Sequence, residues 1–100
     1  MTGFVQIIEW KTHRIDEVRA LNEEWSSRFP RQQGPTRVVV AADRDEPDSY
    51  VTMAEFASYE EAMKNSNDPV TSEFAARMAE LCDGPPTFHN LDITRLEDRT

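Results

Sequence analysis

The stretch Ser49–Gly84, SYVTMAEFASYEEAMKNSNDPVTSEFAARMAELCDG, decides the fold. Its first part, Tyr50–Ala57, is typical of a strand, because aromatic and β-branched residues fit a pleated surface. Ser58 with a glutamate three residues later is a capping box that begins a short helix. Asp68 followed by proline begins a second helix, with aspartate as the cap and proline at the first helical position. Gly84 and the two prolines after it end that helix, so the stretch predicts a strand followed by two helices.

The rest of the chain adds three strands and a longer helix. Apolar and alternating patterns predict strands over Phe4–Trp10, Arg37–Asp43 and Thr87–Thr94. Apolar residues three and four positions apart predict an amphipathic helix over 15–29, which Pro30 ends. Turn residues between the second and third strands predict an antiparallel hairpin.

The predicted order, β-α-β-β-α-α-β, is that of an α+β ferredoxin-like domain over residues 1–100, with a four-stranded antiparallel sheet and its helices on one face. The first three strands are apolar on both faces, whereas the helices cover only one face of the sheet. An apolar surface of several hundred square ångströms would therefore remain exposed in a monomer. This predicts a homodimer that pairs two copies through the sheet face around a two-fold axis.

Composition excludes several classes of partner. Lys and Arg number 11 against 19 Asp and Glu, and the net charge of −8 argues against binding to nucleic acid. The longest apolar run, Val38–Ala42, is far below the roughly 20 residues of a membrane span, and no signal-peptide pattern is present. We therefore expect a soluble cytoplasmic protein without membrane contact. Cys82 is the only cysteine, which excludes an internal disulfide and a cysteine-based zinc site, and its place on a helical stripe predicts a small buried hydrophobe.

The sequence FASYEEAM at residues 56–63, followed by Asn67-Asp68-Pro69 and Phe74, resembles the third strand and following helices of the dimeric α/β-barrel superfamily. The nearest group is the antibiotic biosynthesis monooxygenase-like family, and the similarity in element order covers residues 4–94. The resemblance implies a homodimeric barrel with a small-molecule cavity between sheet and helices in each subunit. Proteins of this fold include cofactor-free oxygenases acting on aromatic polyketide-like compounds, haem-degrading enzymes, small isomerases and proteins without demonstrated activity.

The haem-degrading branch has features that this chain lacks. Phe56 stands where that branch has Trp, no His occurs between Ser58 and Phe88, and the first strand contains no Asn. These departures argue against haem. The doubly apolar strands and the family resemblance imply a protein that binds a small apolar or aromatic molecule, and we expect it to be a cofactor-free monooxygenase for an aromatic or polyketide-like substrate, without a tightly held metal or flavin. Two alternatives stay open: a non-catalytic binding or assembly protein, and an isomerase or cyclase that uses the same cavity.

Candidate site residues follow from the strands. His89 is the one imidazole in a strand, and it is the predicted catalytic acid or base if its ring points into the cavity. Aromatic side chains are predicted to line the cavity, because flat rings supply a large apolar area. Polar side chains inside apolar strands are predicted to contact the substrate, because buried polar groups need partners. The predicted substrate-binding residues are Gln6, Trp10, Tyr50, Thr52 and Phe56.

Other polar residues have a second interpretation. A buried Glu9 or Glu55 is a possible base, and either is equally a partner for Arg37 across the sheet at a dimer interface. His13 is predicted to be solvated surface. The acidic residues between Asp43 and Asp48 lack the glycine and distal glutamate of a calcium loop, so we predict a solvated hairpin tip and no metal site.

Overall fold

The computed structural model describes residues 3–28 and 34–99, and it confirms the predicted element order. The seven elements are β1 (Phe4–Lys11), α1 (Ile15–Arg28), β2 (Arg37–Ala42), β3 (Ser49–Phe56), α2 (Tyr59–Ser66), α3 (Pro69–Leu81) and β4 (Thr87–Asp92). The predicted end of the first helix at Pro30 lies outside the described residues. No helix of the described ranges has the length and apolar character needed to cross a membrane.

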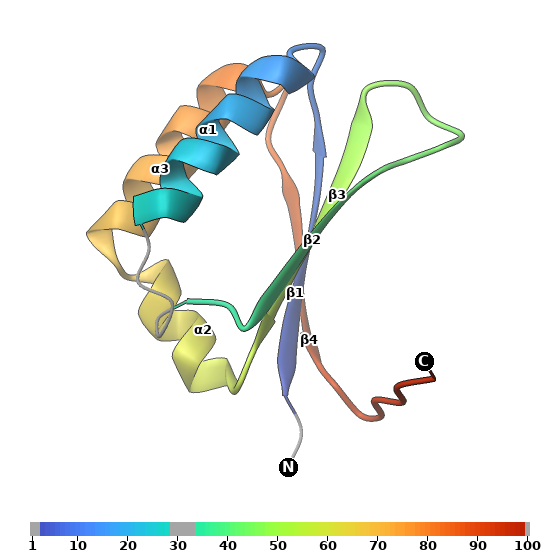
Figure 1. Cartoon of the computed structure of the whole chain (residues 1–100), viewed down its shortest axis with the longest axis vertical. Helices are drawn as coiled ribbons and strands as arrows, with labels where there is room; N and C mark the ends of the chain where they lie inside the picture. The colour runs from blue at the N-terminus through green and yellow to red at the C-terminus, as the bar shows by residue number, and fades with distance from the viewer. Residues whose placement is uncertain (1–2, 29–33, 100) are drawn as a thin grey trace.

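The four strands form one antiparallel sheet in the order β2-β3-β1-β4. The central strand β1 pairs Trp10 with Tyr50 of β3 on one side and Gln6 with Asn90 of β4 on the other. All three helices lie on the same side of this sheet, with α1 and α3 next to each other (Figure 1). The predicted α+β ferredoxin-like arrangement with helices on one face is therefore confirmed.

Local capping explains where the two later helices begin. The Ser58 hydroxyl accepts a hydrogen bond from the Glu61 amide at 3.2 Å, and the Asp68 carboxylate accepts one from the Val70 amide at 2.8 Å. Each bond satisfies an amide that has no partner inside its helix. Both predicted helix starts are confirmed.

The core lies between the sheet and the helices, in two parts. Phe4, Ala54 and Phe56 pack against Ala62 of α2. Val18, Leu21 and Trp25 of α1 are buried, and the Trp25 ring lies 5.7 Å from the Phe74 ring of α3. The edge strands β2 and β4 differ from this pattern, because every one of their residues is exposed. Apolar sheet surface therefore remains exposed on both faces of the sheet.

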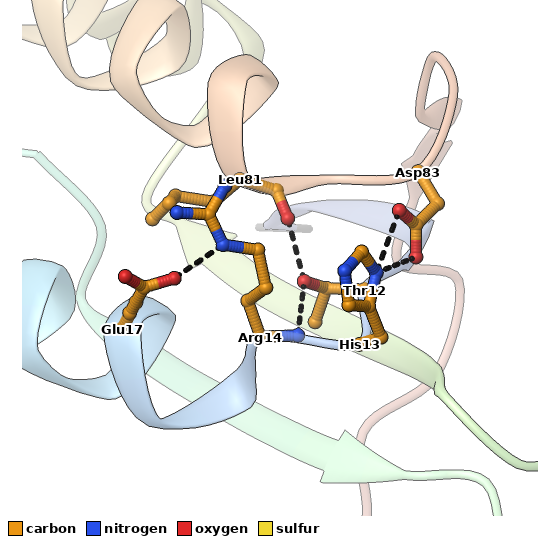
Figure 2. Close-up of polar contacts among 6 residues, drawn as sticks. All are labelled: Thr12, His13, Arg14, Glu17, Leu81 and Asp83. Atoms are coloured by element: carbon orange, nitrogen blue, oxygen red, sulfur yellow. Dashed lines mark hydrogen bonds and ion pairs between the residues drawn. The ribbon is translucent and has the colours of Figure 1, made fainter.

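One corner of the molecule is fixed by a fully buried threonine (Figure 2). The Thr12 hydroxyl donates to the Leu81 carbonyl at 2.6 Å and accepts from the Arg14 amide at 3.0 Å. The Thr12 amide donates to the Asp48 carbonyl at 3.0 Å. This single residue joins the start of α1, the end of α3 and the β2–β3 hairpin.

Candidate functional site

The register decides which side chains share a face of the sheet, because directly paired residues point to the same side. The buried residues Phe4, Trp10, Ala54 and Phe56 identify the side that the helices cover. We use the name helix-facing surface for the following residues of that side, of which Trp10 is buried and those of the edge strands are exposed: Gln6, Ile8, Trp10, Val38, Val40, Tyr50, Thr52, Phe88 and Asn90. The opposite side is the open face, formed by Val5, Ile7, Glu9, Arg37, Val39, Ala41, Val51, Met53, Glu55, Thr87, His89 and Leu91.

Three predicted binding residues meet at one end of the helix-facing surface. The Trp10 and Tyr50 rings stack at a centroid distance of 4.8 Å with 19° between their planes. The Trp10 indole N–H donates to the Thr52 hydroxyl at 2.9 Å. The Thr52 hydroxyl keeps its own proton to donate, so a polar donor lies beside a flat aromatic pair.

A polar pair occupies the middle of the same surface. The Gln6 side-chain amide donates to the Asn90 side-chain carbonyl at 3.0 Å across the β1–β4 pair. Each amide group has both donors and an acceptor, so one bond between them leaves capacity for further hydrogen bonds. Gln6 and Asn90 therefore lie side by side on the helix-facing surface.

Apolar side chains of the edge strands border these polar groups and remain accessible. Val38, Val40 and Phe88 point to the helix side, yet they are 51%, 48% and 53% exposed. The helical layer covers β1 and β3 and leaves both borders of the surface open. A largely apolar surface with a few fixed polar groups is the usual composition of a small-molecule site.

Phe56 is on the same side of the sheet but far from this group. It is six residues from Tyr50 along β3, about 20 Å at 3.3 Å per residue. It is packed in the core with Phe4, Ala54 and Ala62 and is 5% exposed. The structure therefore brings Trp10, Tyr50 and Thr52 into contact, and it places Gln6 beside Asn90 farther along the same side of the sheet. Phe56 is packed in the core.

His89 lies on the open face, with the sheet between its ring and the helix-facing surface. Its paired residue on β1 is Ile7, and its Nε2 lies 2.7 Å from a carboxylate oxygen of Glu9. The ring is thus oriented by a carboxylate, which sequence pattern alone did not predict. His89 was predicted to act as a base if its ring pointed into a cavity between the sheet and the helices. The ring lies instead on the side of the sheet away from the helices.

The second charged pair of the open face agrees with one of the two interpretations of the glutamates. The Arg37 guanidinium contacts the Glu55 carboxylate at 2.5 Å, across the directly paired positions of β2 and β3. Glu9 and Glu55 both have a partner on this face. The predicted pairing with Arg37 is therefore confirmed for Glu55.

The sequence-based selection missed Asn90, Phe88 and Val40. The alternation of side chains along β4 could have identified two of them, because it places Phe88 and Asn90 on the side of the sheet opposite His89. His89 has the opposite parity and therefore lies on the open face. Once the helix-covered side is known, alternation and strand pairing assign Asn90, Phe88 and Val40 to the helix-facing surface.

The remaining candidates have structural roles. His13 is exposed as predicted, and its Nδ1 lies 3.0 Å from each Asp83 carboxylate oxygen (Figure 2). Cys82 is half-buried, and desolvation raises the pKa of its thiol, with the Asp83 charge adding to the effect. At the hairpin tip, the Asp43 carboxylate accepts from the Asp45 amide at 2.9 Å, which stabilises the turn. Among residues 3–28 and 34–99, no three His, Cys, Asp or Glu side chains gather as metal ligands would.

A hollow of about 530 Å³ lies between α1 and α3, away from every predicted site residue. It is open to solvent, and four of its seven lining residues, Glu17, Glu24, Arg77 and Glu80, are charged. The helix-facing surface is the better candidate site, because its apolar area and fixed polar groups suit a bound organic molecule, whereas the charged groups of the hollow are solvated.

Comparison with solved structures identifies the fold. A mutant form of SnoaB, a cofactor-independent oxygenase from Streptomyces nogalater, superposes with a TM-score of 0.80 at 17% identity, covering 94% of this chain and 95% of that chain. A conserved protein from Methanosarcina mazei Go1 gives 0.79 at 11% identity, covering 91% and 92%. An antibiotic biosynthesis monooxygenase gives 0.74 at 13% identity, covering 92% and 99%.

Neither protein-family models nor curated sequences match this chain, so the likeness is one of structure. The matches extend over nearly the whole of both chains, and the element order and sheet topology agree with the resemblance seen in the sequence. This chain has the fold of the antibiotic biosynthesis monooxygenase-like proteins.

Proposed function

We propose that this protein is a homodimer that binds a small, flat, apolar or aromatic molecule on the helix-facing surface and oxygenates it without a cofactor. One observation carries the binding proposal. Accessible apolar side chains of both edge strands surround the Gln6–Asn90 pair and the Trp10–Thr52 pair. The oxygenase chemistry is supported by the shared fold with SnoaB, which is a likeness of architecture and a weaker warrant than a site.

The reaction that suits this surface is oxidation of a phenol to a quinone by O₂. The substrate loses two hydrogens and gains one oxygen atom, and the second oxygen atom leaves as water. The reacting form is the electron-rich phenolate, which transfers electrons to O₂ directly. On the helix-facing surface the amides of Gln6 and Asn90 are suited to hydrogen-bond the phenolate oxygen. Thr52 and Tyr50 lie two and four residues along β3 from Ala54, the partner of Gln6, and are suited to contact the far end of a polycyclic substrate, with Trp10 stacked behind Tyr50.

His89 stays our predicted catalytic residue only for a substrate that binds at the open face. Its ring and the Glu9 carboxylate lie on the open face, so they are suited to act only on a molecule that reaches that face. His89→Ala distinguishes the two surfaces. Unchanged turnover assigns the chemistry to the helix-facing surface, whereas lost turnover assigns the proton transfer to the His89–Glu9 pair.

The homodimer is proposed from the open face. Val39, Met53 and Leu91 are 42%, 38% and 43% exposed, and they lie on the same face of the sheet, on β2, β3 and β4, with β1 between β3 and β4. Burying this area against a second copy removes it from water at about 25 cal/mol per Å². Sedimentation equilibrium at micromolar concentration tests the proposal, and a species of one chain at all concentrations up to 100 µM contradicts it.

The two tryptophans give a direct test of the binding surface. Both tryptophans are buried, but they lie in different places: Trp10 contacts Tyr50 and Thr52 of the helix-facing surface, whereas Trp25 packs against Phe74 of α3. Trp25→Phe leaves only Trp10, and Trp10→Phe leaves only Trp25. Titration with a panel of polycyclic phenols should change the emission of the Trp25→Phe variant and leave that of Trp10→Phe unchanged. Equal responses, or no response from either variant, contradict binding at this surface.

Oxygen uptake tests the chemistry separately. Consumption of one O₂ for each quinone formed, by metal-free and flavin-free protein, supports a cofactor-free monooxygenase. Binding without oxygen uptake favours a binding protein. Product formation that persists under nitrogen favours an isomerase or cyclase.

A further inference from the structure

The helix-facing surface is free of charged side chains, although the whole chain has a net charge of −8. Its nine residues include no Asp, Glu, Lys, Arg or His. One charged residue of the strands lies on the same side of the sheet, Asp92, which pairs with Phe4. It is two residues beyond Asn90 in β4, about 7 Å at 3.3 Å per residue. The strand charge on this side of the sheet is therefore negative.

The positive charges of the strands lie on the other side of the sheet. Lys11 is paired with Ser49 and Arg37 with Glu55, and both pairs have the parity of the open face. The Glu55 carboxylate also forms an ion pair with Arg37 at 2.5 Å. The strands therefore present no cation to the helix-facing surface.

The cations of the three helices are engaged by other groups. Each of them contacts a carboxylate or lies over an aromatic ring: Arg19 contacts Asp16, Lys64 contacts Glu61, Arg77 contacts Glu24, and Arg28 and Arg77 lie over the Trp25 ring. In the strands and helices that the structure describes, the positive charges thus either lie on the open face or already have partners.

A localised anion binds poorly on such a surface. A carboxylate that is covered by protein loses its water, and this loss is compensated only where a cation or several N–H donors replace the water. The amides of Gln6 and Asn90 keep N–H groups to donate, and these suit one phenolate oxygen whose charge spreads over the rings. A carboxylate at the other end of the ligand meets the hydroxyl groups of Tyr50 and Thr52 and no cation of the strands.

We infer that the helix-facing surface selects ligands by charge: it admits uncharged aromatic molecules and rejects those that carry a carboxylate. This inference rests on the binding function proposed above and names the class of substrate, a polycyclic phenol whose carboxyl group is absent or esterified. The net charge of −8 acts in the same direction over a longer range, because the chain repels anions that approach it.

Three ligands that differ at a single ring position test the selection: a dihydroxyanthraquinone with a methyl group, a carboxylate or a methyl ester at that position. Quenching of Trp10 fluorescence in the Trp25→Phe variant at pH 7 measures the Kd of each. We expect the methyl and ester compounds to bind alike and the carboxylate to bind about tenfold more weakly or worse, because the carboxylate differs from its ester mainly in charge. A carboxylate that binds as tightly as its ester overturns the selection by charge and leaves the proposed binding intact. Absence of binding by all three compounds overturns the proposed function and this inference together.

Val40→Lys and Val39→Lys, each made in the Trp25→Phe variant, separate the local surface from the net charge. Val40 is paired with Thr52 on the helix-facing surface, whereas Val39 lies on the open face, and the two residues are 48% and 42% exposed. Val40→Lys should bring the Kd of the carboxylate to within about threefold of that of its ester, because the added cation compensates the lost water. Val39→Lys changes the net charge by the same amount and should keep the difference of about tenfold. Equal recovery in both variants assigns the selection to net charge and overturns the inference, as does a lack of recovery in Val40→Lys.

Discussion

At the scale of single residues, Thr12 is the buried polar residue whose hydrogen bonds connect three separate segments of the described chain. Its hydroxyl is fully buried and is bonded to both the Leu81 carbonyl and the Arg14 amide. Loss of the hydroxyl leaves two backbone groups without their partner in a place that water does not reach. Such a loss costs more than the bonds themselves contribute, because desolvation of the remaining groups is not compensated.

We therefore expect Thr12→Val, which keeps the shape and removes the hydroxyl, to lower the free energy of unfolding by about 1–3 kcal/mol. Urea denaturation followed by circular dichroism measures the change. Thr12→Ser is the control, since it keeps the hydroxyl and should lose less. Equal stability of the valine variant and the original chain would show that this corner is held by packing.

Cys82 gives a prediction of pH dependence. Burial raises the pKa of its thiol, and the neighbouring Asp83 charge raises it further. The neutral thiol is thus favoured in the folded state. This contribution to stability is present below the pKa of the unfolded chain and is lost as the pH rises through the higher folded value.

The thiolate is the reactive form, so alkylation by iodoacetamide at pH 8 should be slower in the folded protein than in urea. The folded rate should rise at higher pH than the unfolded rate. Asp83→Asn should shift the folded profile part of the way back, because it removes the charge and leaves the burial. Identical profiles for the folded and unfolded chain would contradict a raised pKa.

At the scale of elements, the sequence Asp68-Pro69 determines where α3 begins. Asp68 caps the helix through the Val70 amide, and Pro69 occupies the first position without losing a hydrogen bond. Asp68→Ala should lower the free energy of unfolding by about 1 kcal/mol, and Asp68→Ser should keep most of the stability. Thermal and urea unfolding of the two variants measure the difference, and an alanine variant as stable as the serine variant would contradict a capping role.

The elements also show why some of the fold could be predicted from the sequence. Ser58 and Asp68 specify helix starts through residues two or three positions away, so the sequence alone contains the whole signal. The β2–β3 hairpin is equally local. These features were predicted correctly because their causes lie within a few residues of one another.

The sequence could not predict which face of each strand the helices cover, because that depends on contacts between distant segments of the chain. Val38 and Val39 are equally apolar, and only the side on which the helices lie tells them apart. That choice depends on contacts between distant segments, as does the orientation of His89 by Glu9, which is 80 residues away. Gln6, Trp10, Tyr50 and Thr52 share one side of the sheet because they have the same parity on paired strands, and their role in binding stays a prediction.

At the scale of the whole molecule, one sheet presents two accessible surfaces with different proposed tasks. Each surface includes apolar residues of β2, because nothing in the described chain covers that strand. Val39 lies on the open face and is 42% exposed, whereas Val40 lies on the helix-facing surface and is 48% exposed. Val39 and Val40 are neighbours of the same residue type, so substitutions at these two positions test the proposed dimer surface and the proposed binding surface separately.

The pair Val39→Asp and Val40→Asp tests this division within one strand. The two variants add the same charge at nearly the same exposure, so their general effects on stability and net charge should match. Val39→Asp should convert the dimer to monomers in sedimentation, because it places a carboxylate in an apolar interface. Val40→Asp should keep the dimer and weaken binding of polycyclic phenols by about tenfold or more, since a charge beside Thr52 must lose water when an apolar ring covers it. If both variants lose dimerisation and binding together, the two faces act as one surface and the separation of tasks is wrong.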